Sequence, residues 1–193
     1  MKNRILAGIS GGIVLFVWTI VSFGALPFRN TMAMRKVDNE LQLHEILKNT
    51  VVDPGVYLVL RDLPDDPELH EAFYSGPTYR IEYPGGGHES GLGMLIFTVL
   101  LFLTMPVVPA WMLTLTNEKV LSRYSSRVLF ITGFGILLGI FGEGFRYVFE
   151  SQPLDYSVFL GLNAVVGWLL AGLVIAGIMR PEKLTIPGEH SPA

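Results

Sequence analysis

Four long apolar stretches dominate the hydrophobic pattern of the chain, at residues 5–26, 92–115, 128–149 and 156–179. Each can cross a bilayer, because roughly 30 Å of hydrocarbon takes about 20 helical residues at a rise of 1.5 Å. Their apolarity is continuous and lacks the alternation of barrel strands, and a segment in lipid must pair its backbone groups internally. The pattern therefore predicts a mainly α membrane protein with four transmembrane helices.

The polar segment between the first two stretches predicts a small α+β extracytoplasmic domain. Residues 56–60 and 78–83 are rich in β-branched and aromatic side chains, which favours two strands. Asp38 or Asn39 can cap a helix that ends near Asn49, and residues 68–73 suggest a second, short helix. So small a domain has little core, so we expect it to lean on the helix ends or on another protein.

The division of the chain follows from these elements. We expect a first transmembrane helix in residues 1–27, the outer domain in 28–91, three helices in 92–180 and a disordered tail in 181–193. The first helix could be misread as a signal peptide, because Ser22-Phe23-Gly24 offers small residues near its end. Its apolar run is longer than an ordinary signal peptide needs, which predicts a retained anchor.

Charge gives the orientation. The segments before the first stretch, between the second and third, and after the fourth together hold seven basic and three acidic residues, whereas residues 26–91 hold six basic and eleven acidic. Short cytoplasmic loops carry the excess of Lys and Arg, so both termini should be cytoplasmic and the acidic segment should face outward. Half of the 193 residues are hydrophobic and the mean hydropathy is +0.46, which agrees with a membrane class.

Glu143 and Arg146 are the ionisable residues of most interest. Three positions apart on a helix, their side chains share a face and can neutralise one another. About 16 residues separate Arg127 from Glu143, which places the pair near the outer boundary of the hydrocarbon. A structural ion pair is the favoured interpretation, and a site for a lipid headgroup, an ion or a substrate is the alternative.

Small residues recur at helical spacing and predict close helix packing. The positions are Gly8 and Gly12 on the first helix, Gly135, Gly139 and Gly142 on the third, and Gly167 and Ala171 on the fourth. The same surfaces could instead bind another membrane subunit. Asn163 is a polar residue inside an apolar span, where an interhelical hydrogen bond is favoured over a binding role.

Two further residue types bear on packing. Pro106 and Pro109 remove backbone donors and should kink the second helix. Trp111 suits an interfacial anchor, whereas Trp18 and Trp168 lie deeper and should pack between helices.

Catalytic chemistry finds little support. The chain has no cysteine, so disulfides and thiolate metal sites are excluded. His44, His70 and His88 lie on the outer side, but neither HExxH nor helical ligand spacing occurs, and we expect no metal and no cofactor. No phosphate-binding glycine loop is present, and the acidic outer face argues against nucleic acid. We therefore expect no enzyme activity.

Several short motifs carry a resemblance. Residues 18–22 run into Leu26-Pro27-Phe28, residues 54–57 read Pro-Gly-Val-Tyr, and residues 153–156 precede the glycine-containing run 166–173. On these motifs the chain resembles a group of small uncharacterised bacterial inner-membrane proteins with four transmembrane helices. The resemblance covers most of the chain and implies a bacterial inner-membrane location, but no activity or catalytic residue.

Three functional hypotheses remain, in order of preference. The first is a non-catalytic accessory or scaffold subunit that uses its small-residue helix faces and acidic outer domain to bind a larger membrane complex. The second is a small transporter, channel or lipid-binding protein that uses Glu143, Arg146 and the kinked second helix. A membrane enzyme comes third, and it would need His88 and another outer histidine to converge.

Overall fold

The computed structural model describes residues 2–26, 36–60, 65–86 and 91–179. Within them, four helices are long and apolar enough to cross a membrane: Asn3–Ala25, Leu92–Leu113, Tyr124–Phe149 and Leu154–Ile178. The prediction of four apolar helices is confirmed, with ends within a few residues of those expected. The chain is thus a multi-pass membrane protein by its architecture. The expected tail, 181–193, lies outside the described residues.

Three of the four spans contain a change of helix geometry. The elements of the bundle are α1 (Lys2–Ile20), η1 (Val21–Ala25), α4 (Leu92–Thr104), α5 (Val107–Leu113), α6 (Glu118–Ser122), α7 (Tyr124–Leu137), η3 (Leu138–Glu143), α8 (Gly144–Phe149) and α9 (Leu154–Ile178). Both η elements are π-helical turns within otherwise α-helical spans. The second span is the one that breaks, between α4 and α5.

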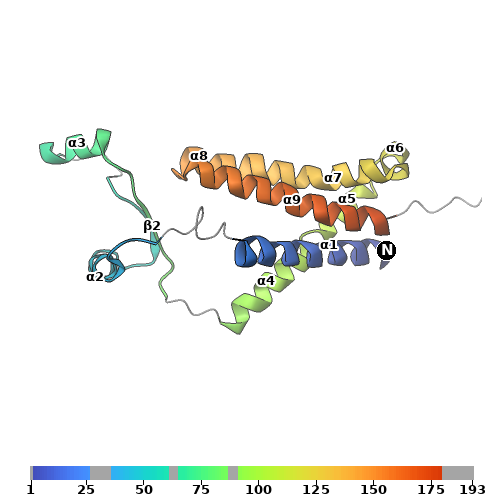
Figure 1. The fold of residues 1–193 in the computed structure, drawn as a ribbon, viewed down its shortest axis with the longest axis horizontal. Coiled ribbons are helices and arrows are strands. Elements are labelled where there is room, and N and C mark those ends of the chain that lie inside the picture. The colour runs from blue at the N-terminus through green and yellow to red at the C-terminus, as the bar shows by residue number, and fades with distance from the viewer. Residues whose placement is uncertain (1, 27–35, 61–64, 87–90, 180–193) are drawn as a thin grey trace, which may run out of the picture.

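The fourth span organises the bundle. Helix α9 packs along both α1 and α7, and α5 packs against α1 and α7 (Figure 1). The start of α1 and the end of α9 lie at the same end of the bundle, beside α6 (Figure 1). A chain that crosses a membrane four times has both ends on the same side, and the positions of these two helix ends agree with that.

The second span is kinked at proline, as expected. Helix α4 ends at Thr104 and α5 begins at Val107, with the buried Pro106 between them. Pro106 has no N–H to donate, so the helical hydrogen-bond ladder is interrupted there. Helix α4 diverges from the bundle, packs chiefly against α1 and contains no buried residue (Figure 1).

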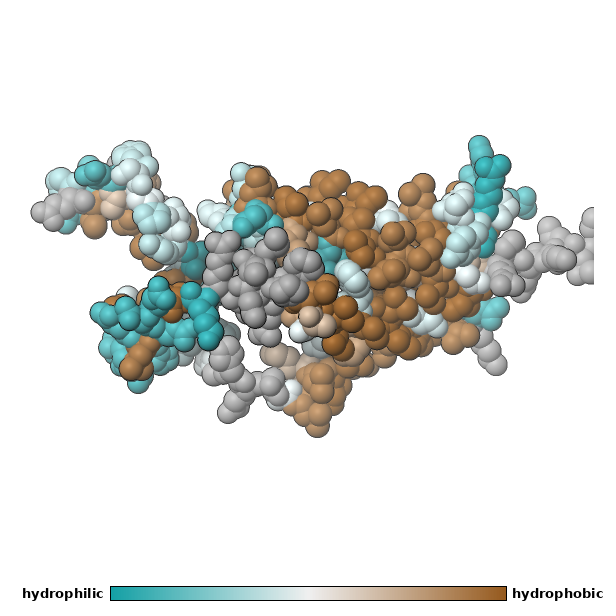
Figure 2. Space-filling view, viewed as in Figure 1, coloured by the Kyte–Doolittle hydropathy of each residue, from teal (hydrophilic) through white to brown (hydrophobic). Residues whose placement is uncertain are grey.

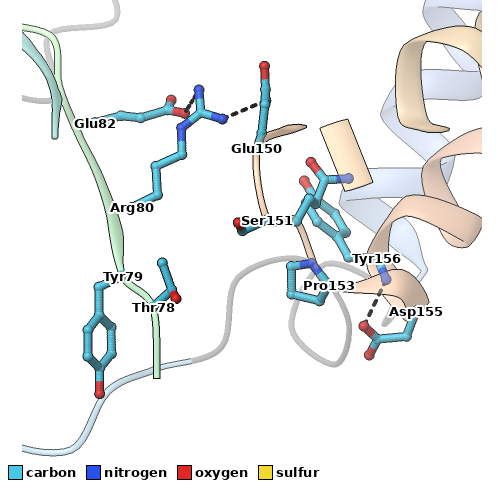
Figure 3. A pocket seen from close by; sticks show the side chains of 10 residues that line it. Thr78, Tyr79, Arg80, Glu82, Glu150, Ser151, Pro153, Asp155 and Tyr156 are labelled. Atoms are coloured by element: carbon cyan, nitrogen blue, oxygen red, sulfur yellow. Dashed lines mark hydrogen bonds and ion pairs between the residues drawn. The ribbon is translucent and has the colours of Figure 1, made fainter. Parts of the chain in front are cut away.

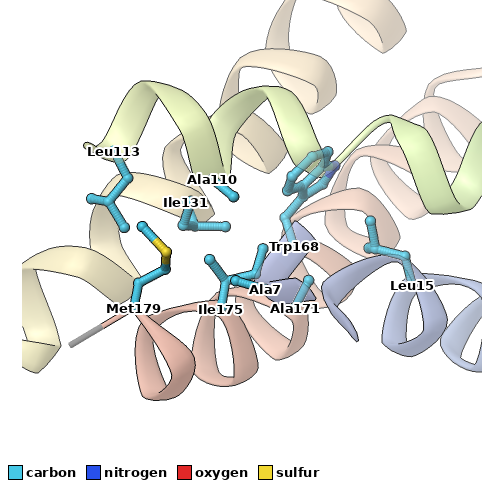
Figure 4. Packing of buried hydrophobic residues seen from close by; sticks show 9 residues of the cluster. All are labelled: Ala7, Leu15, Ala110, Leu113, Ile131, Trp168, Ala171, Ile175 and Met179. Carbon is cyan, nitrogen blue, oxygen red and sulfur yellow. The ribbon is translucent and has the colours of Figure 1, made fainter. Parts of the chain in front are cut away.

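The hydrophobic core lies toward the end of the bundle that holds α6. All four spans contribute to it, and its buried members are Ala7, Leu15, Ala110, Leu113, Ile131, Trp168, Ala171, Ile175 and Met179 (Figure 4). Neither η3 nor α8 contains a buried residue, and neither does α4. The bundle is therefore tightly packed at one end and open at the other.

The outer segment contains the expected helices and strands, whereas the packing expected of a domain is not confirmed. Its elements are α2 (Glu40–Thr50), β1 (Gly55–Leu58), α3 (Pro67–Ser75) and β2 (Arg80–Tyr83). The strands pair antiparallel, with Gly55 opposite Tyr83 and Leu58 opposite Arg80. However, no described residue of 36–86 is buried, and α2 and α3 project apart (Figure 1). A packed α+β domain is not confirmed, because a two-stranded hairpin without a covering layer has no core.

The surface divides into polar ends and an apolar belt. Figure 2 shows hydrophobic side chains over the helical bundle, with hydrophilic side chains over α2 and at the opposite end of the bundle. Large apolar side chains such as Phe141, Ile140 and Leu129 are exposed on this belt. Such a continuous apolar surface would be costly in water, which indicates a lipid environment.

Candidate functional site

The polar site of the bundle forms where the third span meets the fourth. The π-helical turn η3 ends at Glu143, and Arg146 follows on α8. Close packing of η3 on α9 holds this region in place: a Cβ on Gly139 would lie 2.9 Å from the carbonyl oxygen of Gly161. π-Helical turns often occur at functional sites, which makes this turn a candidate.

Glu143 has two side-chain partners. Arg146 Nη1 lies 3.4 Å from Glu143 Oε1, and Gln152 Nε2 donates to Glu143 Oε2 at 3.2 Å. Gln152 Nε2 also donates to the buried Ser157 Oγ, at 2.9 Å. The carboxylate is thereby held by α8 and by the turn that leads into α9, with 16% of its side chain exposed, whereas half of the Arg146 side chain is exposed.

The turn between α8 and α9 places Gln152. Ser151 adopts the left-handed conformation (φ 55°), and the next N–H, that of Gln152, donates back to the Arg146 carbonyl at 3.3 Å. This geometry ends the helix and directs the Gln152 side chain toward Glu143. The sequence pattern did not indicate Gln152 or Ser157 as part of the site. The available signal was an amide in a very short connection between two apolar helices.

An apolar groove begins at the carboxylate. It has a volume of about 320 Å³, and Glu143 is the charged residue among those that line it. Its walls come from η3 and α8 on one side and from α9 on the other, including Ile140, Val158 and Leu162. The groove is therefore apolar along most of its length and has a charged carboxylate at one end.

Comparison of the chain with protein-family models, with curated proteins and with solved structures finds no match. The site must therefore be interpreted from its own geometry.

The glycines of the first span lie where other helices approach most closely. A Cβ on Gly8 would lie 2.5 Å from the Cα of Val107, and one on Gly12 would lie 2.3 Å from the Phe102 carbonyl oxygen. These glycines therefore allow α1 to touch the backbones of α5 and α4. They serve packing within the chain.

The glycines of the third span do not all act alike. A Cβ on Gly135 would meet the side chain of Trp168 at 2.6 Å, and Gly139 faces Gly161. Gly142 has no heavy atom within 4 Å of a Cβ placed on it. It lines a second apolar cavity instead of a helix contact.

Two of the remaining packing residues, Gly167 and Asn163, lie against Trp18. A Cβ on Gly167 would lie 3.0 Å from the indole of Trp18, and Ala171 is fully buried in the core. The indole N–H of Trp18 donates to the main-chain carbonyl of Asn163 at 3.3 Å. The interhelical hydrogen bond at Asn163 thus uses its backbone, and its half-buried side chain lines a small apolar cavity beside Trp18.

Arg127 has a structural role that the sequence analysis did not assign. It belongs to the basic residues between the second and third stretches, which served only to orient the chain, yet it is 5% exposed. Its Nε donates to the Ala176 carbonyl at 3.2 Å, and its Nη1 donates to the Leu121 carbonyl. Carbonyls in the last turn of a helix lack internal partners, so Arg127 caps the end of α9.

A second polar cleft lies above the first site, between β2 and the start of α9 (Figure 3). Its volume is about 720 Å³. Arg80 pairs with Glu150 at 2.7 Å and with Glu82 at 3.0 Å, and so joins the hairpin to the end of α8. A partly exposed ion pair contributes about 1 kcal/mol at most, so this link is weak.

The histidines do not assemble a metal site in the part of the chain that the structure describes. Within that part, no three His, Asp or Glu side chains lie close enough together to hold a metal ion. The outer residues His44 and His70 belong to different helices, α2 and α3. His88, and with it the pair His88-Glu89, lies outside the described residues.

Proposed function

We propose that the protein is a non-catalytic accessory or scaffold subunit of a larger membrane-protein complex. The observation that carries this proposal is the outer segment, where large apolar side chains face water and no described residue is buried. The most exposed of them include Leu41, Val52, Val56 and Tyr74. An isolated segment of this kind cannot bury enough surface to offset its ordering entropy, so it requires a partner.

The open end of the bundle offers a place for that partner. A cavity of about 600 Å³, here called the outer wedge, is lined by Met105, Val108, Pro109, Phe134, Leu137, Leu138, Phe141, Gly142 and Trp168. One turn of an α-helix, 10–12 Å wide and 5.4 Å long, occupies roughly 500 Å³. The outer wedge therefore has room for a turn of a partner helix.

Aromatic residues extend this surface outward along the third span. The ring centroids of Phe141 and Phe145 are 6.3 Å apart, and those of Phe145 and Phe149 are 4.6 Å apart. Phe141 and Phe149 are largely exposed, and Phe145 is about half exposed. Aromatic rings give large contact areas at interfaces, so this stripe suits a protein partner that continues to the outer segment.

The partner test compares two glycine substitutions. Gly142→Trp should fill the outer wedge and abolish co-purification of the partner in mild detergent. Gly133→Trp is the matched control. A Cβ on Gly133 would likewise meet no heavy atom within 4 Å, and Gly133 lies on α7 outside the outer wedge. The readout is mass spectrometry of the purified complex. A wild-type protein that purifies alone, or a Gly142→Trp variant that keeps its partner, contradicts the proposal.

We further propose a bacterial inner membrane with both termini in the cytoplasm and residues 28–91 in the periplasm. Arg4, Lys119 and Arg123 lie at the end of the bundle where α1 begins and α9 ends, which supports the orientation. The bacterial membrane rests on the resemblance alone. Alkaline phosphatase fused at residue 50 should be active and the same enzyme fused after residue 193 inactive. Activity at both positions contradicts the orientation.

The alternative is a small transporter, channel or lipid-binding protein. The observation in its favour is the apolar groove that reaches Glu143. This alternative requires an occupant whose chemistry matches both the groove and the ion pair.

A further inference from the structure

The groove below Glu143 differs in size from the outer wedge. Its volume is about 320 Å³, compared with about 600 Å³ for the outer wedge. As the smaller of the two, it suits a single alkyl chain, which has a much smaller cross-section than an α-helix 10–12 Å wide. The walls are apolar: Ile136, Ile140, Leu154, Val158 and Leu162 all line the groove.

The depth of the polar end matches a lipid headgroup region. Sixteen residues separate Arg127, at one end of the bundle, from Glu143, which corresponds to a helical rise of about 24 Å. The hydrocarbon core is about 30 Å thick, so Glu143 lies close to its outer boundary. An acyl chain in the groove would place its headgroup at Glu143 and Arg146.

The charges of the pair are complementary to one class of headgroup. Gln152 and Arg146 each occupy one oxygen of Glu143, but a carboxylate has about four acceptor positions, so it can accept a further donor. The guanidinium of Arg146 is half exposed and suits a phosphate oxygen. Together they match a headgroup that carries both an ammonium group and a phosphate.

We propose that this groove binds one acyl chain of a zwitterionic aminophospholipid, with its ammonium group donating to Glu143 and its phosphate accepting from Arg146. Phosphatidylcholine lacks the N–H donors, and an anionic lipid has no cation for the carboxylate. The inference develops the lipid-binding alternative and does not depend on a protein partner.

The test measures lipid retention by native mass spectrometry of the full-length protein in detergent. Phosphatidylethanolamine, phosphatidylcholine and phosphatidylglycerol are added at equal concentration. We expect retention of phosphatidylethanolamine to exceed that of the other two by roughly tenfold, because a charge-assisted hydrogen bond is lost with each. Glu143→Gln should abolish this preference and raise phosphatidylglycerol retention, since Arg146 then has no carboxylate. Glu150→Gln is the matched control, because Glu150 pairs with Arg80 outside the groove.

A second pair of variants separates the groove from general stability. Val158→Trp should fill the groove and lower retention of all three lipids, whereas Leu129→Trp, on the exposed face of α7, should not. Equal retention of the three lipids by the wild type, or an unchanged preference in Glu143→Gln, overturns the proposal. So does a photo-crosslinker at position 158 that captures a protein helix instead of lipid. Gly142→Trp should keep the lipid preference, so failure of the partner proposal is distinguishable from failure of this one.

Discussion

Replacing Gly12 with alanine should destabilise the bundle by at least about 2 kcal/mol, in the upper range for an overpacked site. The added Cβ would lie 2.3 Å from the Phe102 carbonyl oxygen and 2.9 Å from the Leu103 Cα. Both atoms belong to backbone, so no side-chain rotation relieves the collision and α4 must move away from α1. The loss is measured as a lower unfolding midpoint of the purified protein in detergent.

Gly133→Ala provides a control of opposite sign. No heavy atom lies within 4 Å of a Cβ at this position, which is within helix α7. Alanine is favoured over glycine in a helix by about 1 kcal/mol, so this variant should be equal to or more stable than the wild type. Equal losses in the two variants would mean that the α1–α4 contact is not what limits substitution.

Replacing Arg127 with methionine should cost about 3 kcal/mol, because it leaves two carbonyl groups without their charged donor. Those carbonyls belong to Ala176 and Leu121, so the end of α9 and the α6 region should loosen together. Methionine keeps much of the side-chain volume, which limits the loss to the polar contacts. The free energy of unfolding in mixed detergent micelles is the measurement.

Arg123→Met removes the same charge from an exposed position four residues earlier. It should change the free energy of unfolding by no more than about 0.5 kcal/mol, as surface substitutions usually do. If both variants lost the same amount, the positive charge itself, and not the capping of α9, would be responsible.

The four spans were predictable because continuous apolarity over about 20 residues has few structural solutions in lipid. The kink at Pro106 was predictable for a similarly local reason. The outer segment shows the limit of such reasoning: its helices and strands follow from local propensity, but whether they pack depends on surfaces that propensity does not describe. The expected elements are therefore present, but among the described residues of the segment none is buried to form a core.

The site was predictable only where its residues are close in sequence. Glu143 and Arg146 share a helix, so their spacing was sufficient, whereas Gln152 reaches Glu143 through a left-handed turn at Ser151. Gly142 was expected to continue the packing face of Gly139, but the π-helical turn rotates it away from α9. The charge of Arg127 could be used to orient the spans from sequence. Its capping of α9 could not be predicted, because it depends on where another helix lies.

None of the outer-segment residues that the structure describes is buried, and this has a consequence for the life of the protein in a cell. Elements without buried side chains open at little free-energy cost, and proteolysis follows the population of open forms. A copy that has not assembled would present this segment to degradation, whereas an assembled copy would shield it. Synthesis in excess of the partner would then be corrected by turnover, and the amount of the protein would follow the amount of the complex.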